Sequence, residues 1–168
     1  MPYSSTECKK EIKEWFDSRS DIIGILDVGC GSGTYPKLLG RDKYRWVGIE
    51  IWEPYVEEFG LKDLYDLLFV GNFFDTWYKA NGINCVIFGD VLEHMTKEQV
   101  VEALRIMEEY PLVFEHVVIS IPIDFPQEAT ENPHEEHKSI WTMEEINAVV
   151  PESYKIRGIS WNIALFIK

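Results

Sequence analysis

The residues most able to do chemistry in this chain surround a glycine-rich turn near its N-terminal end. Glycines at alternate positions let the main chain turn sharply and approach a ligand closely, because no Cβ intervenes. A helix beginning just beyond them would add unpaired N–H groups. The GxGxG spacing differs from the GxGxxG of dinucleotide sites, and a carboxylate before it suits a cationic ligand better than a pyrophosphate. The candidate ligand-binding residues here are Asp27, Gly29, Cys30, Gly31 and Gly33.

A second acidic residue ends the next apolar segment. The letters VGIE at 47–50 place Glu50 at the tip of a strand, where a carboxylate can accept hydrogen bonds from both hydroxyls of a ribose. A nucleoside that carries positive charge fits both acidic residues. S-adenosylmethionine (SAM) has an amino group and a sulfonium, so charge favours it over NAD. An NAD-dependent enzyme and an unrelated glycine-rich turn remain the alternatives.

DVGCGSG at 27–33 followed by VGIE resembles motif I and the acidic motif of class I SAM-dependent methyltransferases. The resemblance covers nearly the whole chain. It implies that Asp27 and the three glycines hold the methionine part of SAM and that Glu50 holds the ribose. It also places Asn72 and Phe73 beside the adenine, although many members carry Asp where Asn72 stands.

DVLEHM at 90–95 resembles the motif that follows the fourth strand in this family. The resemblance places Asp90 near the methionine end of SAM, and Glu93 and His94 beside the transferred methyl group. A neutral O–H or N–H acceptor must lose a proton during methyl transfer, and histidine can take it near neutral pH. His94 and, second, His137 are the candidate catalytic bases. The alternatives are histidines bonded to the backbone and a carboxylate at a helix start.

A metal-dependent alternative uses the same residues. Asp90, Glu93, His94 and His137 match one by one the metal site of small-RNA 3′-terminal 2′-O-methyltransferases, where Glu stands in place of Asp90. HKSIWT at 137–142 is also similar to a motif of those enzymes. The net charge of −13 opposes RNA binding. We therefore expect no metal, and keep Glu93, His94 and His137 as ligands in the alternative only.

Apolar and amphipathic segments predict the elements that must position these residues. Their alternation indicates an α/β, Rossmann-like, seven-stranded and mostly parallel sheet with helices on both faces and a closing antiparallel hairpin near Gly158. Ligands bind at the carboxyl ends of such strands. The expected strands are 22–28, 44–49, 67–70, 84–88, 112–120, 154–159 and 161–167. The expected helices are 6–16, 34–39, 53–59, 96–110, which Thr96 can cap, and 142–149.

The segment 121–140 is expected to be a loop that covers the active site as a lid, because long loops in compact domains are often functional. It carries His134 and His137, and its Asn-Pro-x-Glu-x-His…Trp-Thr pattern resembles that of uncharacterised family members. The acceptor pocket must then form between this lid and the helix within 1–20. Four aromatic residues either line that pocket or belong to the core: Trp15, Phe16, Phe125 and Trp141.

Length and composition limit the classes of function that are possible. The 168 residues suit a single SAM-binding domain, 1–168, and the charge of −13 disfavours nucleic acid and anionic membranes. The three cysteines are widely spaced and lack metal-ligand spacing, and the sequence shows neither a signal peptide nor a membrane-spanning segment. These features predict a cytoplasmic protein.

We expect a SAM-dependent methyltransferase that acts on an oxygen or nitrogen of a small-molecule acceptor. The alternatives are a metal-dependent RNA 3′-terminal 2′-O-methyltransferase and a SAM-binding module without catalysis. The sequence leaves the acceptor and the oligomeric state open.

Overall fold

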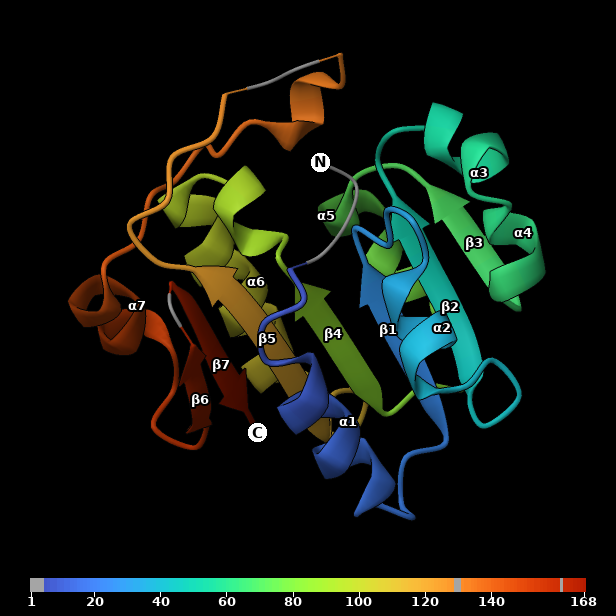
Figure 1. The fold of residues 1–168 in the computed structure, drawn as a ribbon. Helices are drawn as coiled ribbons and strands as arrows, with labels where there is room; N and C mark the ends of the chain where they lie inside the picture. Colours follow the sequence, from blue (N-terminus) through green and yellow to red (C-terminus); the bar gives the residue numbers. More distant parts are fainter. Residues whose placement is uncertain (1–4, 129–130, 161) are drawn as a thin grey trace.

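Seven strands form one sheet in the order β3-β2-β1-β4-β5-β7-β6 (Figure 1). The computed structural model describes residues 5–128, 131–160 and 162–168. The first five strands are parallel, and β7 runs antiparallel to both β5 and β6. The predicted Rossmann-like sheet with its closing antiparallel pair is confirmed. The strands are β1 (Gly24–Val28), β2 (Arg45–Glu50), β3 (Leu67–Val70), β4 (Cys85–Gly89), β5 (His116–Pro122), β6 (Lys155–Ser160) and β7 (Ile163–Ile167).

Helices cover both faces of the sheet, with α1 and α2 in front of it and α6 behind it in Figure 1. Side chains alternate along each buried strand, so Ile25 and Ile87 pack on one face while Leu26 and Val86 pack on the other. The helices of the front face are α1 (Lys9–Asp17), α2 (Thr34–Leu39), α3 (Pro54–Glu58) and α4 (Leu61–Leu64). Those of the back face are α5 (Phe73–Thr76), α6 (Lys97–Glu109) and α7 (Met143–Val149). Three short 3₁₀ turns are η1 (Trp77–Lys79), η2 (Leu92–His94) and η3 (Pro133–Glu135).

Two helices begin with the capping box, a reciprocal pair of side-chain to backbone hydrogen bonds. Thr96 caps α6 together with Gln99, as its position in the sequence predicts. Thr142 caps α7 together with Glu145 in the same way. In contrast, α1 begins at Lys9 and not at residue 6, because Cys8 adopts a left-handed conformation with a φ of 60°.

The fifth predicted strand is wrong at both ends. The chain turns after α6, where the N–H groups of Val113 and Phe114 donate to the carbonyl of Tyr110, so the strand begins only at His116. It continues to Pro122, so the loop after it begins two residues later than predicted. The closing pair also differs from the prediction: Gly158 lies within β6, opposite Leu165 and beside a register shift. Trp161, the predicted start of the last strand, lies outside the described residues.

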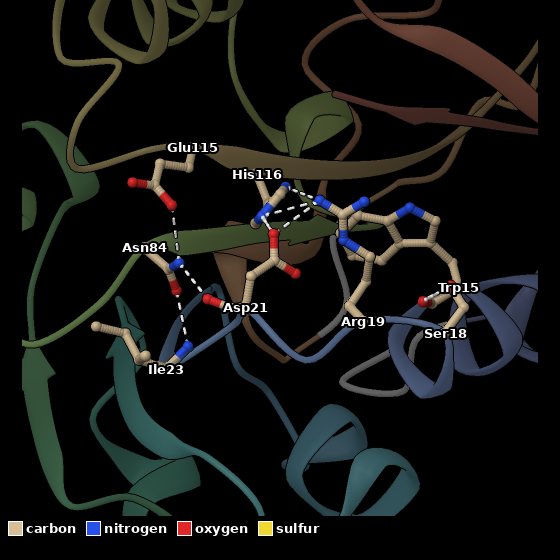
Figure 2. A network of polar contacts seen from close by, with 8 residues as sticks. All are labelled: Trp15, Ser18, Arg19, Asp21, Ile23, Asn84, Glu115 and His116. Atoms are coloured by element: carbon tan, nitrogen blue, oxygen red, sulfur yellow. Dashed lines mark hydrogen bonds and ion pairs between the residues drawn. The ribbon is translucent and has the colours of Figure 1, made fainter.

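A polar network ties together the chain segments that enter the sheet at the end opposite the strand tips (Figure 2). The Asn84 side chain accepts a hydrogen bond from Ile23 N–H at 2.9 Å and donates to the Asp21 carbonyl at 2.8 Å. His116 Nε2 lies 3.0 Å from a carboxylate oxygen of Asp21. These contacts fix the starts of β1, β4 and β5 relative to one another. None of the described helices is long and apolar enough to cross a membrane.

Candidate active site

A cavity of about 420 Å³ lies at the carboxyl ends of the parallel strands. Its walls come from the glycine-rich turn after β1, the tips of β2 and β4, the segment after β3 and the loop after β5. This is the position where ligands bind in open α/β sheets, beside the point at which the strand order reverses between β1 and β4. The sheet thus brings together the residues that the sequence placed just after successive strands.

The glycine-rich turn forms one wall of this cavity. Gly29 has a φ of 63°, and a Cβ there would come within 2.3 Å of the Val91 side chain. The N–H groups of Gly29 and Cys30 donate to the Ile49 carbonyl at 2.8 and 3.1 Å, which fixes the turn against β2. Gly29, Cys30 and Gly31 line the cavity. Gly33 does not: it precedes α2 with a φ of 71°, and its Cα faces Leu64.

Asp27 is a buried carboxylate at the base of the cavity. Burial raises its pKa to about 7, although the Tyr65 hydroxyl donates to its Oδ2 at 2.6 Å and Lys9 adds a favourable charge. A positively charged ligand would favour the ionised form. Tyr65 precedes β3 and carries no local sequence signal for this role, because only the folded sheet brings it to Asp27.

Glu50 is the second buried carboxylate of the cavity. One oxygen accepts a hydrogen bond from Gly31 N–H and the other from Trp52 N–H, each at 2.8 Å. Burial raises the pKa of Glu50 and outweighs these backbone donors. Each carboxylate oxygen can accept further hydrogen bonds, so Glu50 can still receive those of a diol.

Asn72 and Phe73 line the cavity after β3. The Asn72 side-chain oxygen accepts a hydrogen bond from Phe74 N–H at 2.9 Å and so caps α5. A contact between this oxygen and an adenine amino group would have to use its second lone pair. The Phe73 ring is buried and packs edge-on against Phe88, with ring centroids 5.4 Å apart.

Asp90 lies just beyond the tip of β4 and has a left-handed φ of 58°, which is uncommon for a residue with a side chain. Its Oδ1 accepts a hydrogen bond from the Ser120 hydroxyl at 2.9 Å, and its Oδ2 accepts one from Ser5 N–H at 2.7 Å. Lys9 Nζ lies 3.7 Å from Oδ2. Sequence reasoning missed Ser5, Lys9 and Ser120, which lie far from Asp90 along the chain.

Glu93, His94 and His137 form a compact group that lines the same cavity, with one possible ligand atom of each within 4.8 Å of the others. His94 Nδ1 lies 3.0 Å from the Glu136 carbonyl, and His137 Nδ1 lies 2.7 Å from the carbonyl of Phe125. Because a carbonyl can only accept, each Nδ1 carries the proton of its hydrogen bond. Burial lowers the pKa of His94, so its ring is neutral at pH 7.

Glu93 is the most buried member of this group, at 2% exposure. Its Oε2 has no hydrogen-bond partner within the described chain, and burial raises the pKa of its carboxyl well above the usual range. A buried polar atom without a partner is rare and needs a physical explanation. Asp90, the fourth residue of the metal-site resemblance, is not part of the group and bonds Ser5 and Ser120 instead.

The loop after β5 crosses above the cavity and contacts its far side. Ser139 N–H donates to the Glu93 carbonyl at 3.0 Å, which anchors the loop near β4. The Tyr55 hydroxyl of α3 donates to Glu135 at 3.2 Å, and the His134 ring lies 6.0 Å from that of Trp52. Of the four aromatic candidates, Phe125 lines the cavity, Phe16 and Trp141 are core residues, and Trp15 packs against the core.

This fold and cavity define a Rossmann-like, nucleoside-binding type of protein. The sequence matches the family model described as "Methyltransferase domain" over residues 26–109. The chain belongs to this family, and the resemblance to class I SAM-dependent methyltransferases, whose cofactor is SAM, is confirmed. No curated protein sequence matches the chain.

Solved structures share the fold at low sequence identity. A SAM-dependent methyltransferase from Archaeoglobus fulgidus has a TM-score of 0.61 and 17% identity over 84% of this chain, which spans 64% of that protein. Magnesium protoporphyrin IX methyltransferase from Synechocystis PCC 6803 with bound S-adenosylhomocysteine has a TM-score of 0.67 and 13% identity, covering 96% of this chain and 81% of that one. The methyltransferase domain of bacterial CtHen1-CN has a TM-score of 0.65 and 17% identity, with 95% of each chain covered.

Proposed function

We propose that this protein transfers the methyl group of SAM to an oxygen or nitrogen of a small-molecule acceptor, within a single domain closed by the 121–140 loop. The observation that carries the proposal is the arrangement of one cavity. Asp27 and Glu50 lie at the strand tips, where the two polar ends of the cofactor would bind, and His94 and His137 line the same cavity from the segment after β4 and the loop after β5. An acceptor between them would face both the sulfonium and a base.

The cofactor would lie over the glycine-rich turn. Its amino group would contact Asp27, its ribose hydroxyls would donate to Glu50, and its adenine would lie beside Asn72 and Phe73. Asp90 would support the methionine end through the contacts that it makes with its neighbours.

The reaction is an in-line displacement at the methyl carbon. The acceptor lone pair forms the new bond as the carbon–sulfur bond breaks, and the sulfur leaves with that electron pair as a neutral thioether. The acceptor proton passes to Nε2 of His94, whose Nδ1 proton is held by the Glu136 carbonyl. His137 has the same tautomer and is the second candidate base. The loop above the cavity would exclude water.

Isothermal titration with S-adenosylhomocysteine and with NAD tests the cofactor assignment. We expect the first to bind and the second not to bind. Glu50→Gln should weaken binding roughly 10- to 100-fold, as expected for hydrogen bonds to a charged group. Glu53→Gln is the matched control, because Glu53 is exposed nearby. No affinity for S-adenosylhomocysteine in the unmodified protein would contradict the proposal.

The group Glu93, His94 and His137 favours a second candidate, a metal-dependent RNA 3′-terminal 2′-O-methyltransferase. Two imidazoles and one carboxylate are a common ligand set for divalent metals, and the unpartnered Oε2 of Glu93 fits such a role. A bound divalent cation would supply Lewis-acid activation of an acceptor hydroxyl. The carbonyls of Phe125 and Glu136, which accept from Nδ1 of the two histidines, would hold both rings in the required tautomer.

Methylation assays with and without a chelator separate the two candidates. We expect turnover of a small hydroxyl or amine acceptor that persists in EDTA and no methylation of a short RNA with a free 3′ end. Methylation of that RNA only after addition of Mn²⁺ or Mg²⁺ would favour the metal-dependent candidate. Binding of S-adenosylhomocysteine without turnover in either assay would favour a non-catalytic SAM-binding module.

A further inference from the structure

We infer that Lys9 is a positioning residue of the cofactor site: it holds the Asp90 carboxylate in place and, through Asp90, fixes residues 5–8 against the cavity as a strap. This inference rests on the proposed function, since Ser5 of the strap lines the proposed cofactor pocket. Asp90 also lines that cavity, whereas Lys9 does not. Lys9 therefore acts through its neighbours and not on the cofactor itself.

Lys9 is placed where local preferences oppose it. It is the first residue of α1, where the partial positive charge of a helix N-terminus disfavours a cation. It is also buried, at 8% exposure, and a buried ammonium is costly unless it is paired. Its Nζ donates to the Tyr35 hydroxyl at 2.9 Å and lies 3.7 Å from Asp90 Oδ2. Tertiary contacts, not helix formation, explain a lysine at this position.

Asp90 joins three segments through its side chain. The Ser120 hydroxyl of β5 donates to Oδ1, and the Ser5 N–H of the strap donates to Oδ2, beside the Lys9 ammonium. The Tyr35 hydroxyl lies 3.5 Å from the Ser120 hydroxyl and closes the ring of contacts. Asp90 keeps a left-handed backbone, which persists only where surrounding contacts determine it.

Loss of the ammonium would change this arrangement. The Asp90 carboxylate would lose the ammonium beside its Oδ2 and would remain near Glu93, whose pKa its charge helps to raise. A partly buried carboxylate that loses a neighbouring cation is stabilised by turning toward solvent. The hydrogen bond from Ser5 N–H to Asp90 would then weaken, and Ser5 would be held less firmly at the cavity.

A double-mutant cycle on cofactor affinity tests this chain of contacts. Isothermal titration with S-adenosylhomocysteine would compare the unmodified protein with Lys9→Met, Asp90→Asn and the double variant. We expect each single substitution to raise Kd about tenfold, and the double variant to bind no more weakly than Asp90→Asn. Additive losses would overturn the inference. Lys10→Met is the matched control, because Lys10 is exposed and pairs only at the surface with Glu14.

Amide hydrogen exchange by NMR gives a readout independent of cofactor binding. We expect the Ser5 amide to exchange faster in Lys9→Met, and the Trp46 amide, which donates to Asp66, to keep its rate. Tyr35→Phe should speed Ser5 exchange less, and it provides a second variant if Lys9→Met fails to fold. Unchanged exchange of the Ser5 amide in both variants would contradict the inference that Lys9 fixes residues 5–8 through Asp90. If the unmodified protein binds no S-adenosylhomocysteine, the proposed function fails while this comparison still decides the role of Lys9.

Discussion

Asp27 shows how burial and ligand charge act on one residue. Its pKa is raised to about 7 by burial, so in the absence of ligand about half of the molecules carry a neutral Asp27 at neutral pH. A ligand with an ammonium group would bind the ionised form. The ligand must therefore remove a proton from part of the protein population, and affinity must depend on pH.

We predict that affinity for S-adenosylhomocysteine falls on the order of tenfold as the pH is lowered from 7 to 5.5, since the pKa of Asp27 lies near 7 and protonation removes its charge. The ligand's own amino group stays protonated throughout this range. Titration calorimetry at several pH values measures the slope. Asp27→Asn should bind more weakly and show a flat profile, and an equal slope in that variant would contradict the assignment.

We predict that His94→Ala lowers kcat by 10²- to 10⁴-fold, which is the usual contribution of a general base, while Kd for S-adenosylhomocysteine changes less than threefold. His137→Ala should have a smaller effect on kcat if His94 is the base. Steady-state kinetics with an identified acceptor and calorimetry separate the two quantities. If both variants lost kcat equally, and added divalent cation restored neither, the result would contradict His94 as the single base. The two histidines would then share the proton transfer.

The local order of residues predicted that Asp27, Glu50 and the glycine-rich turn lie at one end of the sheet, because each comes at the end of an apolar strand; Gly33, also a candidate, does not line the cavity. It did not predict Tyr65, Tyr35 or Lys9. These side chains come from helices or turns, and only the packing of the front face brings them to Asp27 and Asp90. Aromatic and lysine side chains carry no local signal that separates such a role from ordinary core or surface positions.

At the scale of elements, the loop after β5 connects the two halves of the cavity mouth. It is anchored near β4 through Ser139 and reaches α3 through Glu135. The sequence predicted this loop from its length and polarity, although β5 takes its first two residues. The turn at 112–115 was predicted as strand because its residues are apolar, and apolar character alone cannot separate a strand from a buried turn.

We predict that Tyr55→Phe weakens binding of S-adenosylhomocysteine about threefold to tenfold and speeds its dissociation. The substitution removes the hydrogen bond from the Tyr55 hydroxyl to Glu135, and so one of the contacts that hold the loop over the cavity. Stopped-flow displacement measures the dissociation rate. Tyr78→Phe is the matched control, because Tyr78 is exposed and does not line the cavity. An unchanged rate in Tyr55→Phe would contradict a closing role.

At the scale of the whole molecule, stability in the absence of ligand should rise as the pH falls from 8 to 6. The raised pKa of Asp27 contributes stability that is present below its unfolded value, near 4, and is lost as the pH rises through about 7. Lowering the pH also reduces repulsion within a chain of net charge −13. We expect Asp27 alone to contribute about 1.4 kcal/mol across this range, or roughly 3 °C in Tm.

Thermal unfolding followed by circular dichroism at pH 6 and 8 measures this effect. Asp27→Asn should remove much of the difference, because the amide does not titrate. Carboxyls whose pKa is lowered by surface partners, such as Asp66, lose their contribution only at more acidic pH. His94 and His134, whose pKa burial lowers, oppose the trend near pH 6, because the unfolded chain binds protons there more readily than the folded chain. The comparison with Asp27→Asn therefore isolates the effect of Asp27, and an equal pH dependence of Tm in that variant would contradict the role of burial at Asp27.

The five carboxyls that line the cavity, Asp27, Glu50, Asp90, Glu93 and Glu135, have a consequence for turnover. Methyl transfer discharges the sulfonium, so the spent nucleoside carries one positive charge fewer than the one that entered. An acidic enclosure attracts it less strongly than the charged molecule. The chemistry of each cycle would thereby weaken the binding of its own by-product and favour its replacement by fresh donor.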